Sequence, residues 1–367
     1  MKSKALYFSL TTVESCRDSA KPKQASFCSR CSKICFIFSF SLLLLTACND
    51  EWKEEQYKHY IGFRAPLDDN GVTAIYVPFS RHNDDGSLTF GQGKSNYLLP
   101  VIVSGSTTNA ADITVHVAHD TDTLGILNYQ RFQNRRELYY VDMSDYASYP
   151  ETMVIPAGKD VGLLDIRFDF TGIDLTQKWV LPIKVADDPA YGYRSHPRKH
   201  YNNAMLRIYP YNDYSGNYAA TTLKLANSDD DTSGAIGMET SRAYVVDENT
   251  VFFYAGNINE TRTDRKNYRI FARFEEGDQG KVELWSENPL MKFQTDGKAS
   301  FRIYDKIDDV QPYLVHHYII INNIWYTYVD YTSVNGLELP YTAEGSMTLE
   351  RRINTQVPNE DQAIEWN

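Results

Sequence analysis

The sequence predicts an all-β protein built from a β-sandwich followed by an antiparallel β-barrel or second sandwich. Aromatic residues make up 13% of its 367 residues, and 27 of them are tyrosines. Tyrosine and β-branched residues favour strands. Turn residues recur about every 8–12 positions, which is the spacing of short strands, and no segment of about 12 residues or more has convincing helical periodicity. A length of about 320 residues beyond the N-terminal leader favours two domains.

The N-terminal segment contains an apolar run, residues 34–45, that is followed by a pair of small residues and Cys48. The run is about 12 residues long, which fits the core of a signal peptide and is short of the ~20 residues that span a bilayer. Small residues before a cysteine are the pattern that a lipoprotein signal peptidase cleaves. We therefore expect residues 1–47 to be a lipoprotein signal peptide and Cys48 to carry the lipid. A cleaved leader without lipid and a short membrane helix are the alternatives.

All five cysteines lie at or before position 48. Once the leader is removed, only Cys48 remains, and its sulfur is expected to be joined to lipid. The rest of the chain can therefore form no disulfide framework, thiolate metal site or cysteine nucleophile. An exported chain of this kind must be stabilised by its core alone.

The negative charge of the chain beyond the leader argues against a nucleic-acid-binding protein. The formal net charge is −11 for the whole sequence, and the leader itself is basic. A negative surface repels nucleic acid and anionic membrane faces, but is compatible with neutral ligands such as sugars. Residues 48–60 are polar and acidic, and we interpret them as a tether between the lipid and the folded body.

The first domain is expected at residues 61–209. Seven short segments with strand character in about 150 residues favour a β-sandwich of immunoglobulin-like type. Within residues 178–185, Trp179 shares one face with three aliphatic residues, which predicts that it belongs to the core. Pro182 on the other face predicts an edge strand. The expected strands are residues 72–79, 97–103, 112–118, 152–155, 161–168, 178–185 and 204–209.

The second domain is expected at residues 210–353, as a meander that closes into a barrel or folds into a sandwich. Asn322 and Asn323 lie between two long apolar segments and predict a hairpin turn, since asparagine tolerates positive φ. The polar tail, residues 354–367, is expected to be loosely held. The expected strands are residues 218–225, 242–246, 251–255, 268–275, 281–285, 300–304, 313–321, 324–331 and 346–352.

Four short motifs resemble a known family. Residues 154–159 (VIPAGK) and 179–183 (WVLPI) resemble the N-terminal Ig-like domain of unknown function that is common in Bacteroidota surface lipoproteins. Residues 214–218 (YSGNY) and 345–351 (GSMTLER) resemble the lipocalin-like C-terminal domain that often follows it. These motifs are structural, so the resemblance transfers no catalytic residue.

The resemblance implies a role in polysaccharide utilisation, where such proteins occur beside SusD-like proteins and TonB-dependent transporters. It implies a lipid-anchored protein of the outer membrane that faces the cell exterior. The expected function is therefore non-catalytic binding of a polysaccharide or oligosaccharide. An adhesive or structural surface subunit is one alternative, and a glycan-active hydrolase is another.

Sugar binding needs aromatic faces for stacking and carboxylates or amides for the hydroxyl groups. Trp285 shares the polar face of its predicted strand with Glu283, which makes it a candidate platform. The aromatic run Trp325, Tyr326 and Tyr328 is a second candidate. Because this run spans both faces of its strand, some of its members are expected to be core residues.

The sequence contains no signature of an enzyme or of a metal site. A glycosidase needs two carboxylates that flank the scissile bond, and the acidic pairs in this chain are typical of solvated loops. The histidine pairs on predicted strands point to opposite faces and cannot share a metal. No G-x-S-x-G, P-loop or dinucleotide fingerprint occurs. We therefore expect no catalytic residue, no metal and no cofactor.

Overall fold

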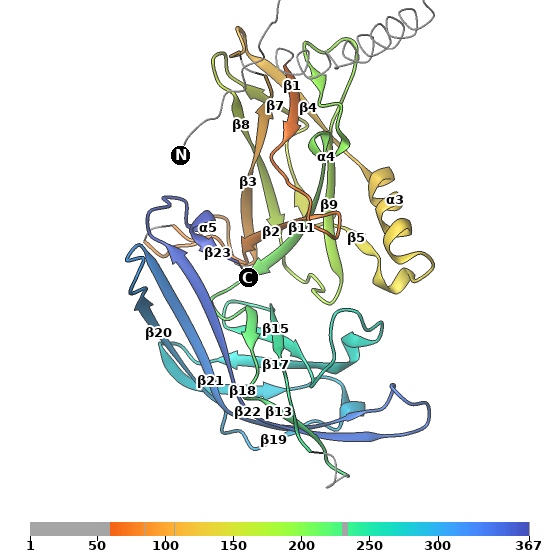
Figure 1. Ribbon diagram of the computed structural model, residues 1–367, viewed down its shortest axis with the longest axis vertical. Coiled ribbons are helices and arrows are strands. Elements are labelled where there is room, and N and C mark those ends of the chain that lie inside the picture. The colour runs from red at the N-terminus through yellow and green to blue at the C-terminus, as the bar shows by residue number, and fades with distance from the viewer. Residues whose placement is uncertain (1–58, 84, 106, 230–233, 367) are drawn as a thin grey trace, which may run out of the picture. The chain divides into compact units, whose positions relative to one another are not determined.

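The computed structural model describes residues 59–366, except 84, 106 and 230–233. It confirms the expected all-β class: a β-sandwich is followed by a closed β-barrel (Figure 1). The leader, Cys48 and nearly all of the expected tether lie outside the described residues. None of the helices in the part of the chain that the structure describes is long and apolar enough to cross a membrane.

The first sheet of the sandwich has five strands, in the order β10-β1-β3-β8-β6. The pairing of β1 with β10 is parallel, and the other pairings are antiparallel. The strands are β1 (Tyr60–Phe63), β3 (Lys94–Val103), β6 (Ala147–Ser148), β8 (Val161–Asp169) and β10 (Arg194–Ser195).

The second sheet has six strands: β2-β11-β9-β4-β7, with β5 also paired to β9. The pairings of β2 with β11 and of β5 with β9 are parallel. The strands are β2 (Thr73–Pro78), β4 (Ile113–His119), β5 (Tyr140–Asp142), β7 (Thr152–Ile155), β9 (Lys178–Val185) and β11 (Asn203–Tyr211).

The core of the sandwich lies between the inner faces of these two sheets. Leu99 and Val101 from one strand, Leu164 and Ile166 from the next, and Leu181 from the opposite sheet are completely buried. Their alternation along each strand is the period-2 pattern of a half-buried sheet. Trp179 is only half-buried and packs against the edge of this core, where its Nε1 donates to the carbonyl of Asp174 at 2.8 Å.

The expectation of an edge strand at Pro182 is wrong, because β9 lies between β11 and β4. Along one side of β9, strand β5 pairs as far as Val180 and strand β4 pairs from Ile183 onward. The carbonyl of Pro182 accepts from the backbone of Asp120 on that side, so the proline nitrogen also points there. Proline is tolerated because its missing N–H falls in the gap between the two partner strands.

A helix that the sequence pattern did not reveal, α3 (Thr121–Phe132), covers the outer face of the second sheet. Asp120 caps its N-terminus by accepting from the backbone of Thr123, which is the standard role of aspartate there. Leu124 and Phe132 pack onto the sheet, whereas Ile126 is exposed. This mixture of apolar residues on both faces hides the helical period in the sequence. Short helical turns follow at η1 (Arg136–Leu138) and α4 (Lys199–Asn202).

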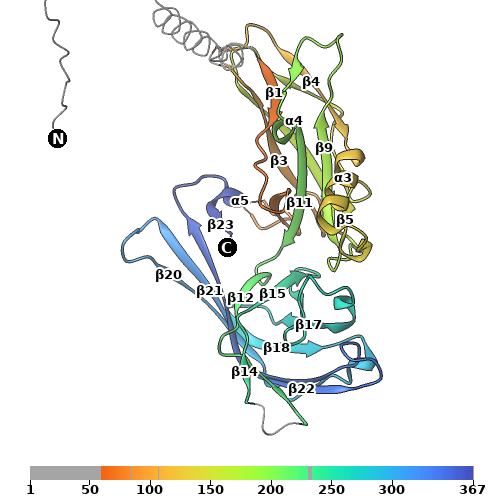
Figure 2. The same cartoon turned by 45° about the vertical axis from the view of Figure 1, so that its right-hand side comes forward.

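Eight strands form the closed barrel, because β21 and β22 pair with each other as well as with their other neighbours. The two are longer than the other barrel strands and extend toward the C-terminal segment (Figures 1 and 2). The barrel strands are β12 (Gly216–Ala219), β15 (Thr240–Val245), β16 (Thr250–Tyr254), β17 (Arg269–Phe274), β18 (Gln279–Trp285), β20 (Ser300–Ile307), β21 (Leu314–Asp330) and β22 (Leu339–Asn354).

Short elements complete the second domain. The segment expected to be one strand at 218–225 is instead two strands separated by a turn. The remaining elements are β13 (Lys224–Asn227), β14 (Ile236–Gly237), η2 (Arg265–Tyr268), η3 (Pro289–Met291), β19 (Gln294–Thr295), α5 (Glu360–Ala363) and β23 (Ile364–Glu365).

The expected hairpin at Asn322 and Asn323 is wrong: both residues lie inside the single strand β21. The pairing with β22 slips there by one residue, from Ile321 opposite Met347 to Ile324 opposite Gly345. Asn323 has a φ of 55°, so the tolerance of asparagine for positive φ serves a β-bulge instead of a turn. The bulge changes which positions face inward, from odd numbers before it to even numbers after it.

The C-terminal tail is packed against the body, contrary to the expectation that it is loosely held. Strand β23 pairs with β22. The Trp366 ring stacks on Tyr76 of the sandwich at 4.1 Å between centroids. Asp361 forms an ion pair with Arg81 at 2.5 Å. The tail therefore joins the barrel strands to the second sheet of the sandwich.

Candidate ligand-binding groove

Two of the aromatic residues proposed from the sequence as a binding wall lie inside the barrel. Tyr326 and Tyr328 are 0% and 1% exposed, because the bulge turns even-numbered residues of β21 inward. The Tyr326 hydroxyl accepts from the backbone N–H of Gly256 at 3.1 Å. The structure therefore places both tyrosines in the core, where neither ring has a face open to a sugar.

The other candidates lie on the outside of the barrel. Trp285 is half-buried: Phe271 stacks on it at 5.3 Å between centroids, and the guanidinium of Arg273 lies 5.1 Å from its ring centre. Glu283 is exposed and lies 3.7 Å from Arg273. Trp325 is half-buried on β21. No ring contact joins the two tryptophans within the described residues, so the structure does not bring the proposed platform residues together.

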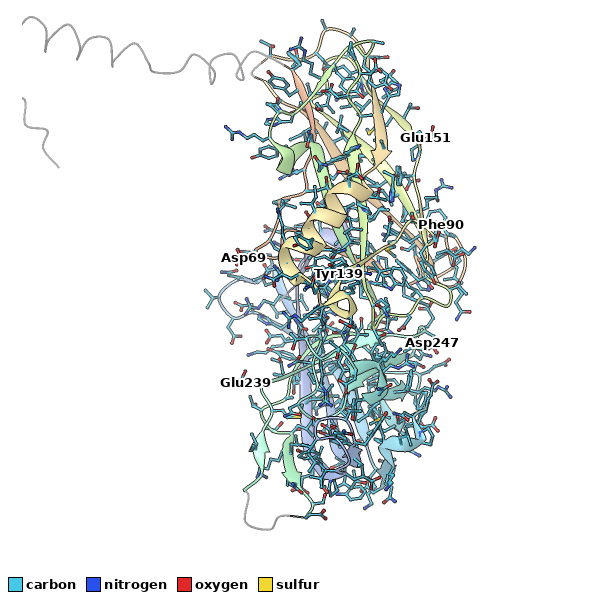
Figure 3. The ribbon with its side chains drawn as sticks, turned by 90° about the vertical axis from the view of Figure 1, so that its right-hand side faces the viewer. Asp69, Phe90, Tyr139, Glu151, Glu239 and Asp247 are labelled. Carbon is cyan, nitrogen blue, oxygen red and sulfur yellow. The ribbon has the colours of Figure 1, made fainter. Side chains whose placement is uncertain are left out.

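An open groove lies beside helix α3, at the edge where the sandwich meets the loop between β16 and η2. Its volume is about 580 Å³, which is within the size range of small-ligand sites. Figure 3 looks onto α3 and shows Asp69 and Tyr139 beside the helix. We call this feature the α3 groove and define it by its lining residues: Asn70, Arg131, Phe132, Arg135, Leu138, Tyr140, Lys178, Arg207, Glu260 and Thr261.

Two aromatic rings organise the cations of the α3 groove. Phe132 and Tyr140 meet edge to face, with 5.4 Å between ring centroids. Lys178 Nζ lies 5.2 Å from the centre of the Phe132 ring, and the Arg131 guanidinium lies 5.7 Å from it. The Arg207 guanidinium lies 5.8 Å from the centre of the Tyr140 ring. Each cation is attracted to the negative face of a ring, so the rings hold three positive charges close together.

Lys178 is the most unusual of these cations. The residue is 9% exposed, although its side chain ends in an ammonium. Within the described residues, its Nζ has no hydrogen bond and no ion pair. Burial lowers the pKa of Lys178 to about 8, the carboxylate of Glu260 opposes this shift, and the positive charges of Arg207, Arg265 and Arg131 add to it. Its Nζ reaches the open groove, but partial desolvation of an ammonium without an anionic partner is still unfavourable.

Arg207 and Glu260 form a closed pair at the inner end of the groove. Arg207 Nη2 lies 2.9 Å from one oxygen of Glu260, and the Tyr244 hydroxyl donates to the other oxygen at 2.5 Å. Burial alone would raise the pKa of Glu260, but Arg207 and Tyr244 outweigh it and lower the pKa to about 2. Glu260 is therefore ionised at neutral pH and cannot serve as a proton donor.

Behind the groove, the junction between sandwich and barrel is closely packed. Tyr209 is held between the guanidinium groups of Arg207 and Arg242, at 4.7 and 4.1 Å from its ring centre. The cavity at this junction has a volume of only about 30 Å³, which is room for one or two water molecules. The junction is therefore an interface and not a sugar site.

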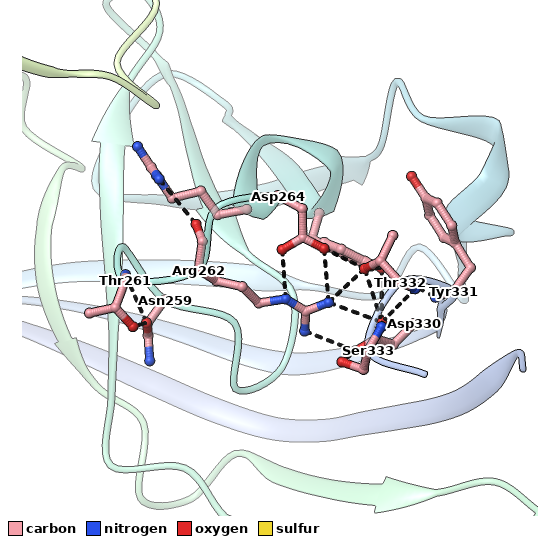
Figure 4. Close-up of polar contacts among 10 residues, drawn as sticks. Asn259, Thr261, Arg262, Asp264, Asp330, Tyr331, Thr332 and Ser333 are labelled. Carbon is pink, nitrogen blue, oxygen red and sulfur yellow. Dashed lines mark hydrogen bonds and ion pairs between the residues drawn. The ribbon is translucent and has the colours of Figure 1, made fainter. Parts of the chain in front are cut away.

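A second group of carboxylates surrounds Arg262 (Figure 4). Arg262 pairs with Asp264 at 2.8 Å and with Asp330 at 2.9 Å. Asp330 also accepts from the hydroxyls of Tyr268 and Ser333, at 2.9 and 2.5 Å. Burial would raise the pKa of Asp330, but these donors lower it well below its ordinary value. Every charge in this network has a partner, so it is a structural clamp for the loop after β21.

Histidines do not assemble a metal centre in the described residues. His316 lies between Asp308 and Glu350, at 2.9 and 2.6 Å. His119 lies 2.6 Å from Asp142. No group of three potential ligands in residues 59–366, outside the gaps noted above, is arranged to hold a metal ion.

The sequence pattern did not predict the α3 groove. Its lining residues come from the turn before β2, from helix α3 and the turn that follows it, from strands β5, β9 and β11, and from the loop before η2. The available signal was Lys178, a charged residue at the start of a strand whose other charged residue is Lys184. Without knowledge of α3, nothing in the sequence indicated that this lysine would be covered.

Comparisons with known proteins place the two halves of the chain in a family. A family model described as a domain of unknown function (DUF4973) matches residues 52–189, and a model of a C-terminal domain matches residues 202–348. No curated protein matches the chain.

Several solved structures are similar over most of the chain. One is an auxiliary nutrient binding protein from Bacteroides thetaiotaomicron, with 48% identity and a TM-score of 0.77, and the match covers 84% of this chain and 100% of that one. A Bacteroides ovatus protein of unknown function has 39% identity and a TM-score of 0.72, with the same coverage. Another from Bacteroides ovatus has 34% identity and a TM-score of 0.70, covering 86% of this chain and 97% of that one. The chain therefore belongs to this family of two-domain Bacteroides proteins, in which a DUF4973 domain precedes a β-barrel domain.

Proposed function

We propose that the protein is a non-catalytic accessory protein of the cell surface that binds a polysaccharide or oligosaccharide in the α3 groove. The observation that carries the proposal is the groove itself. It combines an open volume of about 580 Å³ with amide and charged side chains that two largely buried aromatic rings support, and polar groups of this kind fix the orientation of a ligand. A nutrient-binding role for the relative with 48% identity supports the same class of function.

The carboxylates of the groove and of the Arg262 network favour binding over hydrolysis. A glycosidase needs a carboxylic acid that holds a proton near neutral pH and a second carboxylate on the other side of the bond. Glu260 is the one carboxylate that lines the groove, and its pKa is lowered to about 2. Asp264 and Asp330 are close together, but Arg262 lowers the pKa of both. Neither arrangement provides a general acid.

Lipid attachment at Cys48 would hold this binding body at the outer membrane, facing the exterior. In that position it could deliver glycan to a SusD-like protein and a TonB-dependent transporter. Metabolic labelling with a clickable fatty-acid analogue tests the anchor. We expect the wild-type chain to be labelled and Cys48→Ser to be unlabelled. An unlabelled wild-type chain would contradict the lipid anchor but would not bear on the proposal that the α3 groove binds the ligand.

A binding experiment tests the proposed ligand class and the proposed site together. The purified full chain in detergent would be titrated calorimetrically with a panel of neutral and acidic oligosaccharides. Thr261→Trp fills the groove from an exposed position, and Thr152→Trp makes the same change at an exposed position on β7. We expect Thr261→Trp to lose at least tenfold in affinity and Thr152→Trp to bind as the wild type does. No binding to any member of the panel would overturn the proposal.

A further inference from the structure

The charge of the α3 groove is opposite to that of the chain. Four cationic residues and a single carboxylate line the groove, whereas the whole sequence has a formal net charge of −11. Positive charge in one concave site of an acidic protein attracts anions to that site. The sign of this local charge points to the ligand, because an anion is attracted to the groove more strongly than the net charge of the chain would suggest.

The cations of the groove differ in how far they are already neutralised. Arg207 is paired with Glu260 at 2.9 Å and belongs to the structural interface. Arg131 donates to two neutral acceptors, the carbonyl of Asp69 and the side chain of Asn70. The carboxylate of the neighbouring Asp68 accepts from the backbone N–H groups of Asn70 and Val72. Arg131 therefore keeps a positive charge that no hydrogen-bonded carboxylate balances.

Lys178 supplies an independent observation. Its side chain is covered on β9, beside the Phe132 ring, and its Nζ has no hydrogen-bond or ion-pair partner among the described residues. Desolvating an ammonium without a counter-charge is unfavourable. An oxyanion in the groove would provide the missing partner and form a charge-assisted hydrogen bond with it.

We propose that the α3 groove recognises an acidic glycan, with Lys178, Arg131 and Arg135 binding a carboxylate or sulfate group of the sugar. This inference rests on the proposed function and specifies its ligand class. A neutral sugar in the same position would offer the Lys178 ammonium only uncharged hydroxyl acceptors, whose hydrogen bonds are weaker than those of an oxyanion. The groove therefore favours the anion over its neutral counterpart.

A matched set of ligands tests this charge requirement. Calorimetry on the full chain at about 0.15 M salt would compare oligogalacturonides, the same oligomers fully methyl-esterified, a sulfated galactan oligosaccharide and a neutral galactan oligosaccharide. We expect the oligogalacturonide or the sulfated oligosaccharide to bind at least tenfold more tightly than its uncharged counterpart. Whichever anion binds more tightly identifies the charged group.

Substitutions in the groove test whether its cationic residues bind the acidic ligand. Lys178→Met preserves the length and the apolar stem of the side chain, and we expect it to lose at least tenfold in affinity for the acidic ligand. Lys281→Met removes an exposed lysine on β18 and should leave that affinity unchanged. If Lys178→Met fails to fold, Arg135→Glu tests the inference instead, because Arg135 is exposed and its substitution should not affect folding. The reversed charge should lower the affinity for the acidic ligand at least fivefold.

The outcomes separate this inference from the proposed function. Equal affinity for the acidic and esterified oligomers would overturn the inference that the ligand is acidic, but it would leave the proposed glycan-binding function standing. Binding of the acidic oligomer that neither Lys178→Met nor Arg135→Glu weakens would also overturn the inference. Failure of every oligosaccharide to bind would overturn both proposals.

Discussion

The barrel interior and the α3 groove both contain aromatic residues, but of the two only the groove surrounds an open volume, and we propose it as the binding site. Inside the barrel, Tyr218, Tyr268, Tyr326 and Tyr328 are at most 1% exposed and belong to a core of aromatic and aliphatic residues. In the groove, Phe132 and Tyr140 are also largely buried, but they support cations around an open space. The abundance of aromatic residues in this chain therefore indicates core packing, and the proposed site rests instead on the unbalanced charge beside an opening.

The two regions also differ in whether their covered charged groups have partners. In the barrel domain, the buried charges around Arg262 are completed by Asp264, Asp330 and three hydroxyl groups. In the groove, Lys178 has no such partner within the described residues. A network in which every charged group has a partner stabilises the structure. A charged group without a partner at the surface of a cavity is available to a ligand.

The largest expected effect is on the packing of the barrel. A Cβ at Gly256 would lie 2.1 Å from the Tyr328 hydroxyl oxygen, in a backbone conformation with a φ of 53°. We expect Gly256→Ala to lower the free energy of unfolding by about 4 kcal/mol, by overpacking and backbone strain together. Urea denaturation followed by tyrosine fluorescence measures it.

A matched variant separates the clash from the strain. Gly297 also has positive φ, 69°, but an added Cβ there would meet no atom within 4 Å. Gly297→Ala should therefore lower the free energy of unfolding by only about 1 kcal/mol. Equal losses for the two variants would mean that the barrel interior is less closely packed than the structure shows.

The next effect concerns the ion pair at the inner end of the groove. The pKa of Glu260 is lowered from 4.5 to about 2, so its stabilising contribution is complete above pH 4.5 and is lost as the pH falls toward 2. The difference in unfolding free energy between wild type and Glu260→Gln should therefore shrink by about 3 kcal/mol over this window. Chemical denaturation at several pH values measures the difference. A gap that does not change with pH would show that the ion pair does not form.

A smaller effect is expected from the titration of Lys178. Its pKa is lowered to about 8, and only the protonated form attracts an oxyanion. The affinity for an acidic oligosaccharide should therefore fall about tenfold between pH 7 and pH 9.5, and Lys178→Met should remove this pH dependence. The charged groups that act on the lysine are Glu260, Arg207, Arg265 and Arg131. A pH dependence that persists in Lys178→Met would assign it to another group.

The smallest effect is expected from the tryptophans on the outside of the barrel. Trp285 and Trp325 were proposed from the sequence as sugar platforms, and they lie on β18 and β21, away from the residues that line the groove. Trp285→Ala and Trp325→Ala should each change glycan affinity less than twofold in calorimetry. A tenfold loss in either variant would move the site to the barrel surface.

Local pattern predicted most of the strands, because the alternation of apolar and polar residues fixes which face of a strand is buried. The local pattern gave the wrong prediction where the pairing of strands distant in the sequence determines the structure. Asn322 and Asn323 have the chemistry of a turn, and only the continuous pairing of β22 shows that they form a bulge. Pro182 belongs to a central strand because two partner strands leave a gap beside it.

The site was less predictable than the fold, because its residues are far apart in the sequence. Helix α3 has apolar residues on more than one face, so its period was not visible, and the groove beside it could not be anticipated. Lys178 and Glu260 come together only when the barrel packs against the sandwich. Aromatic residues, by contrast, were easy to find in the sequence, and Tyr326 and Tyr328 turned out to be core residues.

Amide hydrogen exchange with and without a bound oligosaccharide tests the central claim most directly, because it locates the ligand without relying on any substitution. If the α3 groove is the site, the ligand should slow exchange in α3 and in residues 255–261, and leave β18 and β21 unchanged. Protection confined to β18 and β21, around Trp285 and Trp325, would contradict the account.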